Sequence, residues 1–199
     1  MTSNNFPIIP IKLKGETVKL KPLKVKHRTK LLEAAADGEL WNLWFTSVPN
    51  KDTIDSYLDK AWVEQDHGSQ LAFVVYHKRD KKIIGTTRFM NIDPTNRRLE
   101  IGHTWYSKSY QRTRVNTECK YLLLKHAFEH LKCIAVEFRT HVVNNASRNA
   151  IQRIGANEDG ILRNHRILVD GKYRDTAVYS IIESEWPTVK KNLLDKLKA

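Results

Sequence analysis

Between residues 110 and 118 the chain reads YQRTRVNTE, and this stretch opens a long apolar helix directly after a strand-like segment. A helix start that follows a strand presents unpaired backbone N–H groups and the positive end of the helix macrodipole. Both attract a phosphate or pyrophosphate, and Arg112 and Arg114 add positive charge at the same place. The stretch therefore predicts an anion-binding turn. The alternative interpretation is a capped helix start that binds nothing, with Thr113 or Asn116 as the cap.

A second helix start lies further along the chain, where residues 144–147 read NNAS and the helix closes at Gly155. Asparagine is a preferred N-cap and serine suits a first turn, so Asn144 and Ser147 also have a purely structural interpretation. Taken together, the two helix starts predict a cofactor with a nucleotide tail that is held across both of them.

The sequence from Leu99 to Gly155 resembles the Gcn5-related N-acetyltransferases (GNAT), in particular their RimJ/RimL-like branch. Gln111 matches the first position of the family's Q/R-x-x-G-x-G/A pyrophosphate turn, and Asn144 with Ser147 matches its N-x-x-S helix start. The chain departs from the family pattern at Arg114 and Asn116, which stand where small residues are usual.

The resemblance implies a single-domain α/β fold over residues 1–199, with a core of about 16–183 and a C-terminal helix over 183–198. Its mixed, mostly antiparallel sheet would be flanked by helices and would splay between the fourth and fifth strands to admit the cofactor. The implied enzyme transfers an acetyl group directly from acetyl-CoA, its co-substrate, to a primary amine and needs no metal. The acceptor stays open between a protein N-terminus and a small amine, and the family also implies a homodimer.

The same resemblance assigns the cofactor contacts to the fourth strand and to the two helix starts. The implied contacts are Thr104, Trp105, Tyr106, Gln111, Arg112, Thr113, Arg114, Val115, Asn116, Thr117 and Asn144. Ser147 would give the departing thiolate a hydrogen bond or a proton, because a hydroxyl at the positive end of a helix stabilises developing charge.

The strand over residues 99–106 is one residue longer than the commoner family form, which predicts a β-bulge where the acetyl group sits. Glu100 and His103 are the nearest titratable groups that could take a proton from the acceptor amine, and ordinary strand surface is their alternative role. Alternation along a strand places the two on opposite faces, so only one is expected to face the cleft. The catalytic candidates are therefore Ser147, Glu100 and His103.

Composition and net charge limit the number of domains and the kinds of partner that are expected. The chain has 199 residues, 41% of them hydrophobic, which suits one domain with a substantial core. Its net charge of +12 favours polyanions, but the lysines are scattered without interleaved aromatics, so nucleic acid is not expected as the main partner. The positive field would instead draw in the polyanionic CoA. The main alternative function is an inactive module that binds CoA or another polyanion, suggested by Arg114 and Asn116.

A more remote alternative is a zinc hydrolase. Residues 126–130 read HAFEH, which matches the H-x-x-E-H pattern of inverted zinc proteases. No third-ligand motif follows, and both histidines lie on the helix that the acetyltransferase interpretation buries.

The chain is expected to be cytoplasmic. Cys119 and Cys133 suit buried thiols in a reducing compartment. Residues 1–5 show no start of a signal peptide, and the longest apolar run, residues 71–76, is too short to span a bilayer.

Periodicity predicts the following elements. Strands are expected at 17–21, 71–76, 83–91, 98–106 and from 134, with a closing hairpin of 161–168 and 174–182 around Asp170-Gly171. Helices are expected at 26–36, 52–63, from 115 and at 183–197, with Asp52 as the N-cap of the second. The acceptor would reach the strand over 100–106 from the side opposite the pyrophosphate. Residues 163–166 and 173–175 flank the closing hairpin, where they would meet the acceptor, a 3′-phosphate or only water.

Overall fold

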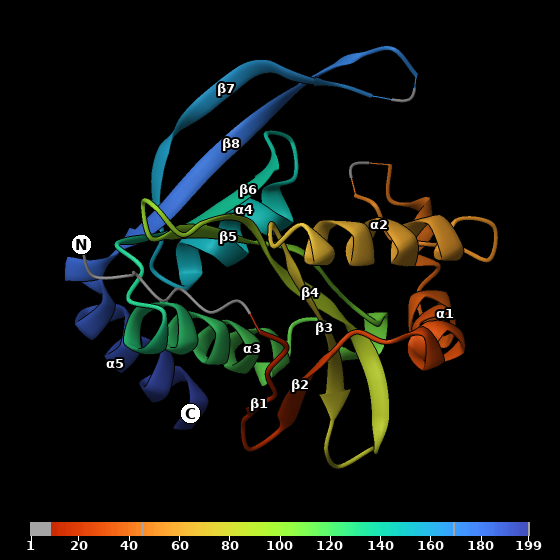
Figure 1. Cartoon of the computed structure of the whole chain (residues 1–199), viewed down its shortest axis with the longest axis horizontal. Helices are drawn as coiled ribbons and strands as arrows, with labels where there is room; N and C mark the ends of the chain where they lie inside the picture. The colour runs from red at the N-terminus through yellow and green to blue at the C-terminus, as the bar shows by residue number, and fades with distance from the viewer. Residues whose placement is uncertain (1–8, 45, 169, 199) are drawn as a thin grey trace.

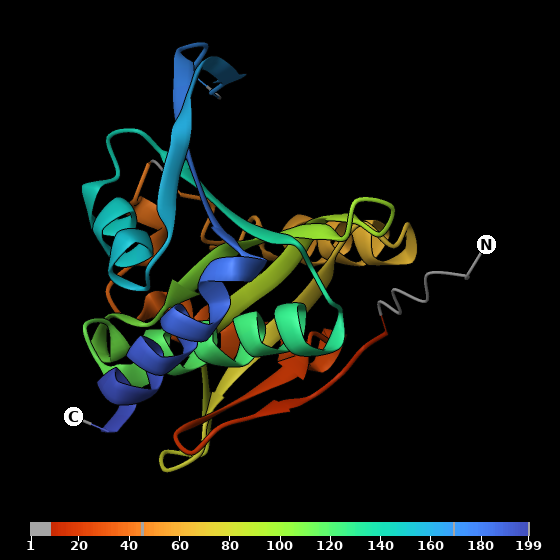
Figure 2. The same ribbon diagram turned by 90° about the vertical axis from the view of Figure 1, so that its left-hand side faces the viewer.

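The computed structural model describes residues 9–44, 46–168 and 170–198, which form one eight-stranded sheet with helices on both faces (Figures 1 and 2). The strands are β1 (Leu13–Lys14), β2 (Val18–Pro22), β3 (Leu71–His77), β4 (Lys82–Asp93), β5 (Arg98–Tyr106), β6 (Ala135–His141), β7 (Asn157–Ile167) and β8 (Tyr173–Ile182). The α-helices are α1 (Arg28–Ala36), α2 (Ile54–Asp66), α3 (Arg114–Lys125), α4 (Asn145–Arg153) and α5 (Trp186–Lys198). The predicted α/β fold is confirmed.

The sheet has the order β1-β2-β3-β4-β5-β6-β8-β7, and every neighbouring pair is antiparallel except β5 and β6. These two parallel strands pair only where Arg98–Glu100 meets Ala135–Glu137. Beyond Glu100 they diverge, since β5 stays paired with β4 and β6 stays paired with β8. The predicted splay is therefore present. The predicted fourth and fifth strands are β5 and β6 in the structure, because the short strand β1 precedes the first strand that the sequence predicted.

Two hydrophobic cores lie on opposite faces of the sheet. On one face α3 and α5 pack together against the strands, and on the other face α1 and α2 cover the half of the sheet that holds β3 and β4 (Figure 2). Strand β3 belongs to both cores, because Phe73 and Val75 face α3 whereas Ala72 and Val74 face α2. Burial on both faces explains why residues 71–76 are a continuous apolar run rather than an alternating one.

Several predicted boundaries were wrong, among them the starts of α2, β7 and α5, the last of which begins at Trp186 after a 3₁₀ turn. Helix α2 begins at Ile54 and not at a cap on Asp52, because the Asn50 side chain accepts hydrogen bonds from the backbone N–H groups of Asp52 and Thr53. Strand β7 begins at Asn157, before the predicted start of the closing hairpin. It is an edge strand with most side chains in solvent, so its first residues carry no apolar alternation.

Cys119 and Cys133 are both buried free thiols, as predicted. Burial raises the pKa of each to about 12, so neither is a reactive thiolate near neutral pH. Within the described residues, the helices are all too short or too polar to traverse a lipid bilayer.

A buried carboxylate fastens α3 to the turn between β1 and β2. Glu118, 5% exposed, accepts hydrogen bonds from the backbone N–H groups of Glu16 (2.6 Å), Thr17 (3.0 Å) and Val18 (2.8 Å). A Cβ at Gly15 would lie 2.5 Å from the Glu118 Cδ, so only glycine lets the turn approach this closely. Glu118 thus anchors the edge of the sheet to α3, the helix whose start forms the predicted anion-binding turn.

We expect Glu118→Gln to lower the free energy of unfolding by about 2 kcal/mol, because charge-assisted bonds to buried N–H groups are replaced by fewer neutral ones. Urea unfolding measures the loss, and Glu33→Gln, on the exposed surface of α1, is the matched control. Equal stability of the two variants would mean that the carboxylate does not hold the turn.

Candidate active site

A cleft of about 830 Å³ opens where β5 and β6 diverge. Its walls are the C-terminal parts of these two strands, the starts of α3 and α4, parts of residues 38–48 between α1 and α2, and the β7–β8 hairpin. The cleft thus brings together both helix starts and the strand that the sequence singled out.

The predicted β-bulge lies in β5 at the cleft. Thr86 pairs with Trp105 and Arg88 pairs with Gly102, so the single residue Thr87 faces both His103 and Thr104. His103 takes a φ of +45°, the left-handed conformation of the extra residue. The bulge resets the alternation of side chains along the strand.

Because of this reset, the expectation that Glu100 and His103 lie on opposite faces was wrong. Both side chains line the cleft, and the His103 ring lies 6.3 Å from the ring of Tyr57 on α2. Thr104 instead turns toward α3, where its hydroxyl accepts a hydrogen bond from Lys120 Nζ.

Burial raises the pKa of Glu100, which is 6% exposed, and the nearby Arg139 and Asn91 partly oppose that rise. Asn91 Nδ2 donates to Glu100 Oε2 at 2.7 Å, and Arg139 Nε lies 3.6 Å from the same oxygen. For His103, burial lowers the pKa to about 3, with the positive charges of Arg88, Lys60 and Arg166 adding to the effect. His103 is therefore neutral across the physiological range, whereas the pKa of Glu100 lies above that of an ordinary glutamate.

The start of α3 has the geometry of an anion-binding turn. The helix begins at Arg114 with Thr113 as its N-cap, and the Thr113 hydroxyl accepts a hydrogen bond from the Val115 N–H. Arg112 precedes it with a φ of +59°, and Gln111 Nε2 donates to the carbonyl of Tyr106 at 3.0 Å. This last bond ties the turn to the end of β5, so cap and cleft wall form one unit.

The predicted cofactor residues do not all face the cleft. Eight of them line it: Thr104, Trp105, Tyr106, Gln111, Arg112, Thr113, Asn116 and Asn144. Val115 and Thr117 have buried side chains, and the Arg114 guanidinium leaves the turn to donate to the carbonyl of Leu197 on α5. The two residues that depart from the family pattern therefore leave the turn open, since Arg114 points away and Asn116 accepts a bond from the Tyr106 hydroxyl.

The start of α4 faces the same cleft. Asn144 is its N-cap, and the side-chain oxygen accepts the Ser147 N–H at 3.0 Å. Ser147 and Asn144 both line the cleft, so the structural role of the cap and a functional role are compatible.

Lys120 is a cleft residue that the sequence analysis missed. It is 6% exposed, its Nζ donates to Thr104 Oγ1 on β5 at 2.9 Å, and it lies 5.4 Å from the Phe138 ring centroid on β6. Burial lowers the pKa of Lys120 to about 8. The available signal was its position one helical turn after Asn116, on the same side of α3.

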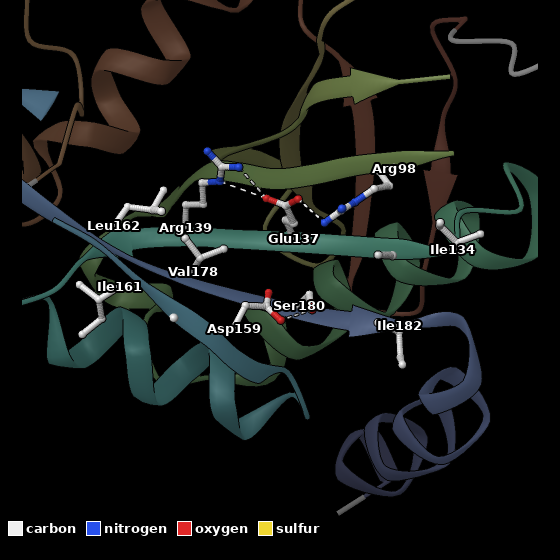
Figure 3. A pocket seen from close by; sticks show the side chains of 12 residues that line it. Arg98, Ile134, Glu137, Arg139, Asp159, Ile161, Leu162, Val178, Ser180 and Ile182 are labelled. Carbon is white, nitrogen blue, oxygen red and sulfur yellow. Dashed lines mark hydrogen bonds and ion pairs between the residues drawn. The ribbon is translucent and has the colours of Figure 1, made fainter. Parts of the chain in front are cut away.

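A second hollow, of about 640 Å³, is lined by β6, β8 and β7 on the sheet face opposite α3 and α5 (Figure 3). Glu137 Oε1 accepts from Arg98 Nη2 at 2.6 Å, and Glu137 Oε2 accepts from Arg139 Nη2 at 2.8 Å. Asp159 accepts from the Ser180 hydroxyl. The carboxylates of this hollow are thus engaged by neighbours, and none of its described lining residues belongs to a helix start. The cleft is therefore the better candidate site.

The H-x-x-E-H residues join α3 to α5. The His126 and His130 rings stack at 5.3 Å, while Glu129 accepts hydrogen bonds from Trp186 Nε1 and Lys190 Nζ. Throughout residues 9–44, 46–168 and 170–198, no three His, Cys, Asp or Glu side chains are grouped to hold a metal ion. The pattern contributes to helix packing here.

Comparison with known proteins agrees with this geometry. The family described as "Acetyltransferase (GNAT) domain" matches residues 17–157. A Bacillus subtilis (strain 168) protein named "Putative ribosomal N-acetyltransferase YdaF" is 28% identical over 178 residues, which are 86% of this chain and 94% of that protein.

Two solved structures have the same fold. A GCN5-related N-acetyltransferase from Brucella melitensis is 31% identical, with a TM-score of 0.83 over 94% of this chain and 85% of that one. Mycobacterium smegmatis RimJ, solved in complex with CoA-disulfide, is 22% identical, with a TM-score of 0.75 over 94% of this chain and 93% of that one.

Proposed function

Because the chain belongs to the GNAT acetyltransferase family and is an N-acetyltransferase that uses acetyl-CoA, we propose that its acceptor is the N-terminal amine of a ribosomal protein. The observation that carries this proposal is the extent of the cleft, which continues from the helix starts to residues 38–48 and the β7–β8 hairpin. An open wall of this kind suits an extended peptide, and the name of the Bacillus relative supports a ribosomal one.

We infer that residues 1–199 form a single acetyltransferase domain. The family match ends at residue 157, but β7 and β8 complete the same sheet and α5 packs on α3. A ribosomal acceptor agrees with the predicted cytoplasmic location. That location and the homodimer stay predictions.

Acetyl-CoA fits the donors that the cleft offers. Among the described strands, β5 pairs only with β4 beyond Glu100, so no strand partner takes up its backbone groups that face the splay. Apart from the Tyr106 carbonyl, which Gln111 Nε2 already engages, these groups could pair with the amides of the pantetheine arm. The start of α3, with Arg112 beside it, supplies N–H groups and positive charge for the pyrophosphate. We assign the contacts to the eight predicted residues that line the cleft, together with the backbone N–H groups of residues 114–117.

The bound co-substrate supplies an activated acetyl thioester, and the protein must then handle one proton and one developing negative charge. We assign proton removal from the acceptor ammonium to Glu100, directly or through a water molecule. Glu100 is preferred over His103 because the pKa of His103, about 3, makes it a poor proton acceptor. We assign the hydrogen bond to the departing thiolate to Ser147, at the start of α4.

Saturating acetyl-CoA should raise the melting temperature, because it binds the native state. With a peptide that has a free N-terminus as acceptor, the enzyme should then release CoA, whose thiol is detected with a thiol reagent. A peptide with a blocked N-terminus and an internal lysine should release none. Thiol release with that blocked peptide, or only with small amines, would disprove the N-terminal acceptor while leaving the acetyltransferase activity in place.

Ser147→Ala should lower kcat about 10- to 100-fold and leave the Kd for acetyl-CoA nearly unchanged, because the lost hydrogen bond forms mainly in the transition state. Steady-state kinetics and equilibrium titration measure the two quantities. Ser147→Thr, which keeps a hydroxyl, should recover part of the rate. If alanine leaves kcat intact in a folded protein, Ser147 acts only in the helix start.

Glu100→Gln should lower kcat/KM at pH 7 about 100-fold, in the range for loss of a general base, and move the pH–rate profile toward alkaline pH. The wild-type rate should fall as the pH drops through the raised pKa of Glu100, because the protonated carboxyl cannot accept the amine proton. His103→Ala is the matched control and should keep the wild-type profile, since His103 stays neutral over the whole measured range. An unchanged profile in Glu100→Gln would place deprotonation elsewhere.

A further inference from the structure

Two arginines of the β7–β8 hairpin face the cleft without partners. Arg166 and Arg174 are directly opposite each other across the two strands, and both line the cleft. In the part of the chain that the structure describes, neither guanidinium group forms a hydrogen bond or an ion pair, and the Arg174 Nε is buried without an acceptor. Like charges placed opposite each other across a strand pair are destabilising, and an anion between them would relieve the repulsion.

The hairpin is shaped to aim these side chains at the cleft. Its register shifts between Leu162 and Arg166, where Asn164 takes a φ of +49°. Asp175 Oδ1 accepts the Asn164 N–H at 2.7 Å, which holds the carboxylate of Asp175 on the bulge; Asp175 does not line the cleft. The bulge therefore keeps the nearest hairpin carboxylate engaged and leaves the arginines uncompensated.

The hairpin arginines belong to the acceptor side of the cleft. The tip of the hairpin extends past the end of β6, away from α3 and α5 (Figures 1 and 2). The charge of Arg166 acts on both Glu100 and His103, and that of Arg174 interacts with Glu100, so the pair lies near the proposed proton acceptor. Arg139, the third arginine of this wall, is already paired with Glu137.

The charge balance of the cleft bears on the acceptor. Among the described residues that line it, Glu100 supplies the single carboxylate, whereas seven are lysines or arginines: Lys108, Arg112, Lys120, Arg139, Arg153, Arg166 and Arg174. Acetyl-CoA compensates charge at the helix starts. An acceptor arrives as an ammonium, however, and a wall with uncompensated arginines repels it unless the same molecule carries negative charge.

We propose that the acceptor is an acidic peptide N-terminus, with an Asp or Glu carboxylate within its first few residues that is bound by Arg166 and Arg174. This inference rests on the proposed N-terminal acetylation and adds its specificity. The carboxylate would accept charge-assisted hydrogen bonds from the two guanidinium groups. Arg166 and Arg174 are thus specificity-determining residues, separate from the groups that handle the proton and the thiolate.

The test uses two peptides, with Ser-Asp-Glu or Ser-Asn-Gln at a free N-terminus and the same sequence beyond. The wild type should show at least tenfold higher kcat/KM for the acidic peptide, and added salt should reduce this preference. The preference should fall to near unity in Arg166→Gln/Arg174→Gln and return in part in Arg166→Lys/Arg174→Lys. Arg163→Gln, an exposed arginine of the same strand outside the cleft, should keep it.

A second measurement separates this inference from the proposed function. Titration of the CoA-loaded protein with the two peptides in N-terminally acetylated form reports the carboxylate contact without turnover, and the acidic form should bind about tenfold more tightly. Equal binding of the two forms, or a preference that survives in Arg166→Gln/Arg174→Gln, would overturn the inference even if acetylation proceeds. So would a marked loss of CoA affinity in the double variant, because the arginines would then hold the CoA 3′-phosphate.

Discussion

The short parallel contact between β5 and β6 governs the rest of this structure. The strands share three paired positions, and each is then held by a different neighbour, β4 for β5 and β8 for β6. A parallel pair that separates leaves backbone N–H and C=O groups without partners, a costly arrangement inside a protein. Lys120, bonded to Thr104 and close to Phe138, occupies the gap between the strands. The fold thus keeps one seam open, and we propose that the pantetheine amides of acetyl-CoA pair there.

The bulge at His103 decides which chemistry the seam can support. It brings Glu100 and His103 into one cleft and turns Thr104 toward Lys120. Three titratable groups then share a poorly solvated region, where each pKa moves toward the uncharged form: up for Glu100 and down for His103 and Lys120. A carboxylate with a raised pKa is a better proton acceptor than an imidazole whose pKa is about 3. The environment therefore separates two candidates that look equivalent as residue types.

The structure also shows where part of the large positive charge of the chain is concentrated. A net charge of +12 spread over a sequence indicates only an affinity for anions. In the folded chain, two parts of the cleft carry positive charge: the turn before α3 with Arg112, and the hairpin with Arg166 and Arg174. The first suits the pyrophosphate of the co-substrate. The second lies near Glu100, the group that we propose as the proton acceptor.

The sequence by itself determined the α/β fold, the order of its elements and the two helix starts, because these follow from local signals: residue periodicity, caps and a strand-to-helix junction at residues 110–118. The resemblance to the family added the bulge, since the strand over residues 99–106 is one residue longer than the commoner family form. Only the tertiary structure decided that Glu100 and His103 face the same way, that Arg114 turns to Leu197, and that Lys120 lies between the diverging strands. The direction of a side chain after a bulge, and the charge that surrounds a group, depend on chain segments distant in sequence, and no local pattern records them.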